Sequence, residues 1–202
     1  MVSEFNKFSN QNVKFNDEEY EFATHEIIAE YLARRLKNDT IADLCCSVGS
    51  NTIQFARFSN KVIAVDIDEE RLKKAKDNAW LYGVDKKIEF VLGDVLDDSL
   101  LSKIKADIVF IDPDWSEDGD CEVHVKDIKE TTPPVPETFE KIRNNITENI
   151  AIKLPKTMNI ESVKNMGQCE LEYVYLDKVL KFIIAYFGNL KNIEGETRID
   201  IK

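Results

Sequence analysis

The sequence predicts an α/β fold in which helices cover both faces of a mostly parallel sheet. Apolar runs of about four to six residues alternate with amphipathic stretches of about 10 to 15, a pattern typical of parallel strands joined by crossover helices. The 202 residues are 43% hydrophobic and 32% charged, as in ordinary globular proteins. A chain of this length indicates a single domain.

The first expected helix follows Thr24, a good N-cap residue, through the run HEIIAEYLARRL. Its apolar residues recur at helical spacing and form the expected buried stripe of Ile27, Ile28, Tyr31, Leu32 and Leu36. A strand is expected next over residues 41–45, followed by a turn that contains Gly49. A second helix through residues 53–56 completes this unit.

The second strand is expected over residues 61–65. The charged run DEERLKKAKDNAWLYG then predicts a helix that ends at Gly83, because glycine readily adopts the left-handed conformation found at helix ends. Three further strands are expected over 88–92, 108–111 and 150–154.

Residues 115–136 lack apolar periodicity, so we expect either a functional loop over a site or a linker. Residues 170–190 alternate on both sides of Asp177 and Lys178, which predicts two antiparallel strands joined by a tight turn. The polar residues 191–202 are expected to form a peripheral tail.

The charge balance restricts the kind of partner. The chain has 38 acidic and 27 basic residues, a net charge of −11, so it lacks the global positive field that binds nucleic acid without sequence preference. A nucleic acid must therefore be held locally. The cations expected near it are Lys141, Arg143, Lys153, Lys156 and Lys164.

Cysteine and histidine usage predicts neither disulfides nor a metal site. The four cysteines have no metal-ligand spacing and are expected to be reduced thiols, and the two histidines lie far apart in the sequence. The sequence shows no secretory signal and no apolar run of the roughly 18 to 20 residues that span a bilayer. We therefore expect a soluble, cytoplasmic protein and favour a monomer over an obligate oligomer.

Small and polar side chains follow four predicted strands. They lie in DLCCSVGSNT (43–52), VIAVDID (62–68), LGDV (92–95) and IVFIDPDW (108–115). In an open α/β sheet, ligands bind outside the carboxyl ends of the strands. These four segments are therefore expected to converge on one pocket.

An acidic residue in this pattern points to a nucleoside. Asp66 ends the second strand and has the position of a residue that accepts hydrogen bonds from both ribose hydroxyls; the alternative, a helix N-cap, fits Asp68 better. The first turn has a single glycine, Gly49, and the nearby Asp43 would repel a pyrophosphate. This disfavours NAD and favours S-adenosylmethionine, which carries cationic sulfonium and ammonium groups.

The segment DPDW is the expected reaction site. The Asp112 side chain and the Pro113 carbonyl can accept the two hydrogens of an exocyclic amine and hold it in line with a methyl group. Trp115 offers a flat face on which a base can stack, although a partly buried core aromatic is the alternative.

Several collinear segments resemble the class I S-adenosylmethionine-dependent methyltransferases. Within that class the chain resembles the RNA cap guanine-N2 methyltransferase family, that of trimethylguanosine synthase. The resemblance covers residues 17–190, between a short N-terminal extension (1–16) and the polar tail (191–202). It is carried by NTIQFA (51–56), VIAVDID, AKDNAWLYGV (75–84), KIEFVLGD (87–94), IVFIDPDW, LPK (154–156) and KFIIAYFGNL (181–190).

The resemblance implies a Rossmann-like fold with a seven-stranded sheet and one antiparallel edge strand. It also implies an S-adenosylmethionine site in which Asp66 binds the ribose, Asp94 the adenine amine and the 43–49 turn the amino-acid end. The implied cofactor-binding residues are Thr24, Asp43, Cys45, Ser47, Gly49, Asn51, Thr52, Asp66, Ile67, Gly93, Asp94, Val95 and Asp112.

On the substrate side, the resemblance implies that Asp112, Pro113 and Trp115 are catalytic, with Asp114 and Trp115 contacting an RNA base. Trp115 would stack on 7-methylguanine while Asp112 and Pro113 hold the acceptor N2. The methyl group would be transferred by direct in-line displacement.

The sequence departs from the family at the acceptor site. The family usually reads Ser-Pro-Pro-Trp followed by glycines, whereas this chain reads Asp112-Pro113-Asp114-Trp115 followed by Ser116 and Glu117. The added negative charge is expected to suit a cationic 7-methylguanine but to oppose the close approach of cap phosphates. Ser47 and Ser50 also replace two family glycines, and Phe5 and Phe8 are the aromatic candidates that could complete a cap site.

Three functions remain open on the sequence alone. The first is methylation of an RNA base amine, with guanine N2 favoured. The second keeps the cofactor but methylates adenine N6 or a free nucleotide. The third is a non-catalytic, cofactor-binding partner subunit, and the substitution at Asp114 is its main support.

Overall fold

The computed structural model describes residues 6–117 and 120–202, and its main sheet has the strand order β10-β8-β9-β7-β4-β1-β2-β3. β9 is antiparallel to both of its neighbours, and the other pairings are parallel. The strands are β1 (Thr40–Leu44), β2 (Lys61–Asp66), β3 (Ile88–Leu92), β4 (Ile108–Ile111), β7 (Ile150–Pro155), β8 (Glu170–Leu176), β9 (Val179–Tyr186) and β10 (Gly195–Ile201).

The predicted α/β class is confirmed, but two details of the predicted sheet are wrong. The sheet has eight strands instead of seven, and its antiparallel strand β9 lies between β7 and β8 instead of at the edge. The additional strand comes from residues 191–202, predicted to be a peripheral tail, because β10 pairs in parallel with β8. The missed signal is the alternation that places Ile199 and Ile201 against the core.

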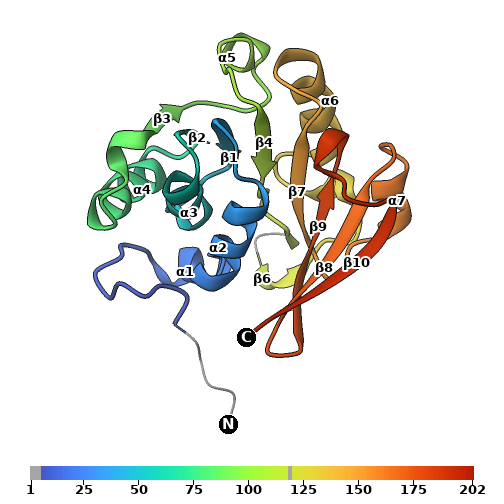
Figure 1. Cartoon of the computed structure of the whole chain (residues 1–202), viewed down its shortest axis with the longest axis horizontal. Helices are drawn as coiled ribbons and strands as arrows, with labels where there is room; N and C mark the ends of the chain where they lie inside the picture. The colour runs from blue at the N-terminus through green and yellow to red at the C-terminus, as the bar shows by residue number, and fades with distance from the viewer. Residues whose placement is uncertain (1–5, 118–119) are drawn as a thin grey trace.

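Helices cover both faces of the sheet (Figure 1). On one face, side chains of α2 (Glu26–Arg35), α3 (Ser50–Phe58) and α4 (Glu69–Leu81) share a buried core with β1, β2 and β4. On the other face, α5 (Asp98–Leu101), α6 (Val135–Asn145) and α7 (Ile160–Lys164) pack in a second core. The remaining helices are α1 (Asp17–Phe22) and the 3-10 turns η1 (Asp85–Lys87), η2 (Ile128–Glu130) and η3 (Gly188–Leu190).

The structure confirms the predicted end of α4 but not the predicted start of α2. Asp68 caps α4 by accepting hydrogen bonds from the backbone N–H groups of Glu70 and Arg71, and Gly83 follows the helix with φ +68°. The predicted N-cap of α2 is wrong. His25 occupies the cap position without a side-chain hydrogen bond, and Thr24 is buried one residue earlier.

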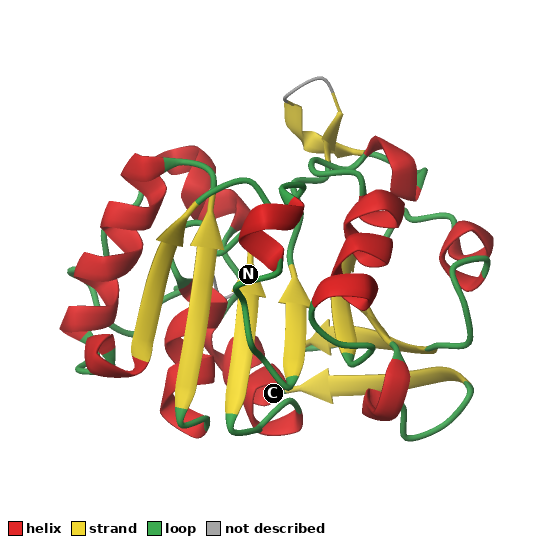
Figure 2. Cartoon of the chain, turned by 90° about the horizontal axis from the view of Figure 1, so that it is seen from above, coloured by secondary structure: helices red, strands yellow, loops and turns green. Residues whose placement is uncertain are grey.

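The described residues of segment 115–136 form a structured wall instead of an extended linker. It contains the hairpin of β5 (Ser116–Glu117) and β6 (Asp120–His124), then η2 and the start of α6. Figure 2 shows the hairpin beyond the ends toward which the parallel strands point. The predicted β8–β9 hairpin is confirmed, and its two turn residues Asp177 and Lys178 have φ of 49° and 67°.

The N-terminal segment is docked on the domain. Phe8 is 7% exposed, belongs to a small core with Val13 and Val48, and stacks on Phe15 with ring centroids 5.6 Å apart. Phe8 is therefore not presented to a base as predicted, and Phe5 lies outside the described residues. Within the described part of the chain, no helix combines the length and apolarity needed to cross a membrane.

Candidate active site

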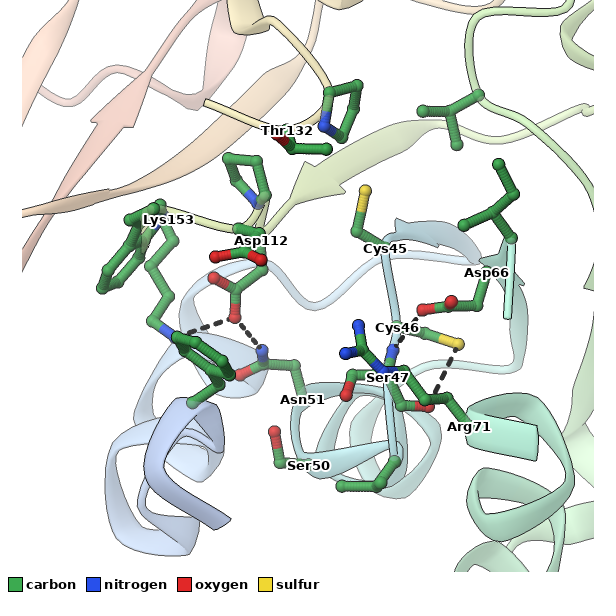
Figure 3. A pocket seen from close by; sticks show the side chains of 18 of the residues that line it. Cys45, Cys46, Ser47, Ser50, Asn51, Asp66, Arg71, Asp112, Thr132 and Lys153 are labelled. Atoms are coloured by element: carbon green, nitrogen blue, oxygen red, sulfur yellow. Dashed lines mark hydrogen bonds and ion pairs between the residues drawn. The ribbon is translucent and has the colours of Figure 1, made fainter. Parts of the chain in front are cut away.

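A cavity of about 340 Å³ lies at the carboxyl ends of the parallel strands, as predicted (Figure 3). This volume lies within the range of small-molecule sites. The sequence-predicted residues that line it are Cys45, Ser47, Asn51, Asp66, Ile67, Gly93, Asp94, Val95, Asp112, Pro113, Asp114 and Trp115.

The loop after β1 has a strained backbone. Cys45 and Ser47 have φ of 69° and 48°, values that side-chain-bearing residues rarely adopt. Two hydrogen bonds hold the loop: the Cys46 N–H donates to the Val65 carbonyl at 2.9 Å, and the Ser47 N–H donates to Asp66 Oδ2 at 2.7 Å. The strain is thus balanced by bonds to the neighbouring strand β2.

Gly49 fixes the approach of this loop to α4. Its φ is +88°, and a Cβ placed on it would lie 3.3 Å from the Ala75 Cβ. A larger residue would be strained both by the conformation and by the contact. Gly49 therefore shapes the turn before α3 without lining the cavity.

Asp66 is fixed at one wall of the cavity. It is 5% exposed, and its second oxygen accepts a hydrogen bond from the Asp68 N–H at 3.0 Å. Burial raises the pKa of Asp66, and the hydrogen bonds from the Asp68 and Ser47 backbone oppose the increase. Exposed Ile67 (71%) follows it on the cavity rim and offers an apolar surface.

Four predicted site residues do not line the cavity: Thr24, Asp43, Gly49 and Thr52. Asp43 lies beneath it because strand alternation directs its side chain to the α3 face, where the Thr52 hydroxyl donates a hydrogen bond to Oδ2. Asp43 is 1% exposed, and burial raises its pKa to about 7.

The raised pKa of Asp43 predicts a pH-dependent stability. The folded state favours the protonated form of Asp43. The stability that this form contributes is therefore lost as the pH rises from the unfolded-state pKa of 3.8 toward the folded-state pKa of about 7. Asp43→Asn retains an acceptor for Thr52 without the charge. The free energy of unfolding of the variant minus that of the unmodified protein, measured by urea denaturation, should rise by roughly 1 to 2 kcal/mol from about pH 5.5 to about pH 8. An equal difference at both pH values would contradict this assignment.

A buried ion pair occupies the other end of the cavity. Lys153 Nζ lies 2.8 Å from Asp112 Oδ2, and the Asn51 side-chain amide donates to the same oxygen at 3.0 Å. Figure 3 shows Asp112 between these two side chains, across the cavity from Asp66. Burial raises the pKa of Asp112, and the charge of Lys153 opposes the increase. The Lys153 side chain is 3% exposed, so it is not the RNA-contacting surface cation that we expected.

Trp115 lies between the cavity and the core. It lines the cavity and also packs against both buried clusters. Lys153 Nζ lies 4.8 Å from its ring centroid, and His124 meets it edge-on at 5.8 Å. The stacking and core interpretations of Trp115 are therefore compatible.

Asp114 has a structural partner that the sequence did not reveal. Its N–H donates to the Thr132 carbonyl at 2.8 Å, and the Thr132 N–H donates back at 3.0 Å. Its side-chain Oδ1 accepts a hydrogen bond from the Ser116 N–H at 2.8 Å. Asp114 thus anchors the wall segment, residues 115–136, to the end of β4, and a proline at this position would lack the N–H donor.

Asp114→Pro is therefore expected to lower the free energy of unfolding by about 1 to 3 kcal/mol, because the Thr132 carbonyl loses its donor. Chemical denaturation monitored by circular dichroism measures the change. The control Asp114→Asn keeps the backbone donor and the side-chain acceptor, and it should stay within about 0.5 kcal/mol of the unmodified protein. A proline variant as stable as this control would show that the bridge is unimportant.

Residues 38–190 match the sequence profile of the family described as RNA cap guanine-N2 methyltransferase. The chain belongs to this family. Trimethylguanosine synthase of Saccharomyces cerevisiae is 28% identical over 201 residues, a match that covers 91% of this chain and 64% of that protein. A 23S rRNA uracil methyltransferase of Marinomonas posidonica is 30% identical over 93 residues, covering 43% of this chain and 21% of the relative.

Solved structures confirm the class I methyltransferase fold. A protein of Porphyromonas gingivalis assigned to the methyltransferases superimposes with a TM-score of 0.73 at 14% identity, covering 91% of this chain and 45% of the other. The O-methyltransferase TomG of Streptomyces achromogenes gives a TM-score of 0.59 at 14% identity, covering 88% and 92%.

Sequence reasoning missed part of the cavity wall. The additional lining residues are Phe22, Ala23, Cys46, Val48, Ser50, Arg71, Leu96, Thr132, Pro133, Pro134 and Lys153. Several belong to α1 or to the wall segment and are brought to the site only by tertiary folding. Cys46, Val48 and Ser50 lie within the 43–52 segment that we expected to reach the pocket, and the position of Lys153 within the apolar run IAIKLP was a further signal.

Three of the cations that we expected to contact RNA have acidic partners. Lys141 pairs with Asp98 at 2.9 Å, and Arg143 pairs with Glu140 at 3.1 Å. Lys164 lies 3.5 Å from carboxylate oxygens of Glu161 and Glu196. These pairs reduce the positive charge that they present to an RNA.

Proposed function

We propose that the protein transfers a methyl group from S-adenosylmethionine to an exocyclic amine of an RNA base, with guanine N2 favoured. The observation that carries this proposal is one continuous cavity that joins the β1 and β2 strand ends to Asp112-Pro113-Asp114-Trp115. The family match over residues 38–190 supports the same reaction class.

The cavity fits the cofactor chemically. Asp66 and Asp94 provide carboxylates at the ends of β2 and β3, and Ile67 provides an apolar surface beside them. The buried Asn51 Oδ1 has no hydrogen-bond partner among the described residues, and Asn51 lines the cavity. Such an acceptor suits an ammonium group. Asp66 would bind the ribose, Asp94 the adenine amine and the loop after β1 the amino-acid end.

The chain's own residues would orient the acceptor. When bound, S-adenosylmethionine supplies a methyl group on a positively charged sulfur. Asp112 Oδ2 is engaged by Lys153 and Asn51, which directs Oδ1 to an acceptor amine. Asp112 and the Pro113 carbonyl would accept the two amine hydrogens, so the nitrogen lone pair faces the methyl group. Because Asp112 would already accept one of the amine hydrogens, it is placed to take the proton that the methylated amine releases.

Methyl-acceptor assays test the proposal. The protein is incubated with labelled S-adenosylmethionine and capped RNA, bulk transfer RNA or ribosomal RNA, and the products are digested to nucleosides for mass spectrometry. We expect N2-methylated guanosine from at least one RNA. Absence of label in every RNA, under conditions where calorimetry shows cofactor binding, would overturn the proposal.

Methylation of adenine N6 is the second candidate, and Asp112 favours it. An Asp-Pro-x-aromatic segment after the fourth strand resembles that of the methyltransferases acting on adenine amines. The same mass spectrometry separates the two products. The non-catalytic alternative loses its main support, because Asp114 has a role in anchoring the wall.

A further inference from the structure

Of the two cations in the described lining of the cavity, Lys153 and Arg71, only Arg71 lacks a close partner. Lys153 is held by Asp112 at 2.8 Å. The Arg71 guanidinium has only distant partners, since Nη2 lies 3.7 Å from Glu18 Oε1 and Nε lies 3.8 Å from Asp68 Oδ2. Charge-assisted hydrogen bonds are about 2.7 to 2.9 Å long, so the N–H donors of this guanidinium remain available to a ligand.

Arg71 belongs to the face of α4 that packs against the loop after β1. Ala75, one turn after Arg71, has its Cβ 3.3 Å from a Cβ placed on Gly49. Further along the helix, the Asn78 side-chain amide donates to the Val48 carbonyl at 3.0 Å. Because residues four and seven apart share one face of a helix, Arg71 continues this row toward the start of α4, and Figure 3 shows its side chain extending toward the cavity. The guanidinium therefore lines the cavity beside the loop that would hold the amino-acid end of the cofactor.

The acids around Arg71 explain why a ligand carboxylate needs it. Asp66 and Asp94 line the same cavity, and neither has an ion-pair partner among the described residues. They suit the sulfonium and ammonium groups of S-adenosylmethionine but repel its α-carboxylate. Burial raises the pKa of Asp66, and backbone hydrogen bonds and the charge of Arg71 oppose this increase, so the guanidinium acts on the ribose end of the site. Arg71 is the lining group that can offset the repulsion.

We propose that Arg71 binds the α-carboxylate of S-adenosylmethionine and makes the cofactor site specific for ligands that carry this group. The inference rests on the cofactor part of the proposed function and adds a residue to it. A guanidinium can donate two parallel N–H bonds to a carboxylate. The α-ammonium is bonded to the same carbon atom as the carboxylate. Asn51 Oδ1, which has no hydrogen-bond partner among the described residues, offers it an acceptor on α3, directly after the same loop.

Calorimetric binding of three ligands tests this contact. S-adenosylmethionine carries the ammonium and the carboxylate, its decarboxylated analogue keeps the sulfonium and the ammonium, and 5′-methylthioadenosine has none of these charges. In Arg71→Gln, we expect the Kd of S-adenosylmethionine to rise at least about tenfold relative to that of the decarboxylated analogue. The Kd of 5′-methylthioadenosine should stay unchanged, because this ligand has no carboxylate for Arg71 to bind.

Lys74→Gln is the matched control. Lys74 lies three residues further along α4, its ammonium is 2.7 Å from Glu19 Oε1 of α1, and it does not line the cavity. Both variants remove an ion pair between α4 and α1, so an effect of loosening α1 would appear in both. We expect Lys74→Gln to leave the ratio of the Kd values of the decarboxylated analogue and S-adenosylmethionine unchanged. Arg71→Lys keeps the charge without the planar fork, so its ratio should lie between those of Arg71→Gln and the unmodified protein.

Two results would overturn the inference, once circular dichroism shows that the variants are folded. The first is an unchanged ratio of the two Kd values in Arg71→Gln, as expected if backbone N–H groups alone hold the carboxylate. The second is an equal fall of the ratio in Lys74→Gln, which would assign the effect to α1. Either result leaves the proposed function in place if the unmodified protein transfers label to RNA, whereas no binding of S-adenosylmethionine to the unmodified protein would overturn both.

Discussion

Replacing Asp112 by alanine is expected to lower the free energy of unfolding by about 3 to 5 kcal/mol and to abolish methyl transfer. The variant leaves the ammonium of Lys153 in a site where its side chain is 3% exposed, without the carboxylate 2.8 Å away. Stranding a buried charge costs much more than losing a surface ion pair. Urea denaturation measures the stability, and transfer of labelled methyl groups to RNA measures the activity.

A second variant separates the two effects. Asp112→Ala combined with Lys153→Met removes both charges and fills the space with an apolar side chain, so most of the lost stability should return. Activity should stay absent because no side-chain acceptor remains for the substrate amine. If Asp112→Ala alone changes stability by less than about 1 kcal/mol, the pair is hydrated and the buried-charge argument is wrong.

The parts of the fold predicted from sequence depend on local signals. The strands at 88–92 and 108–111 have the predicted bounds because short, mainly apolar runs, IEFVL and IVFI, mark them. The hairpin turn at Asp177 and Lys178 is equally local, since two polar residues separate alternating strands. Parallel strand ends meet at one edge of the sheet, so the pocket also followed from these elements.

The missed features depend on partners distant in the sequence. Lys153 appeared to be a surface cation because nothing near it in the sequence shows that it pairs with Asp112, 41 residues earlier. Asp114 appeared to be an uncompensated charge because its backbone partner Thr132 comes from the far side of a hairpin. Both corrections change the predicted electrostatics of the acceptor site more than they change the fold.

Asp66→Ala is expected to weaken cofactor binding by about 1 to 3 kcal/mol, which is roughly a fivefold to 150-fold increase in Kd. Two effects contribute. The ribose would lose its carboxylate acceptor, and the Ser47 N–H would lose the 2.7 Å hydrogen bond that holds the strained loop after β1. Calorimetric titration with S-adenosylhomocysteine measures the change.

Asp68→Ala is the matched control for this prediction. Asp68 is the next acid along the chain, and its side chain caps α4 by accepting hydrogen bonds from Glu70 and Arg71. Its loss should lower the free energy of unfolding by about 1 kcal/mol while the cofactor affinity stays unchanged. If the two variants weaken cofactor binding equally, the effect comes from disturbing the start of α4 and not from a specific contact of Asp66. An unchanged Kd in a folded Asp66→Ala protein would remove Asp66 from the cofactor site altogether.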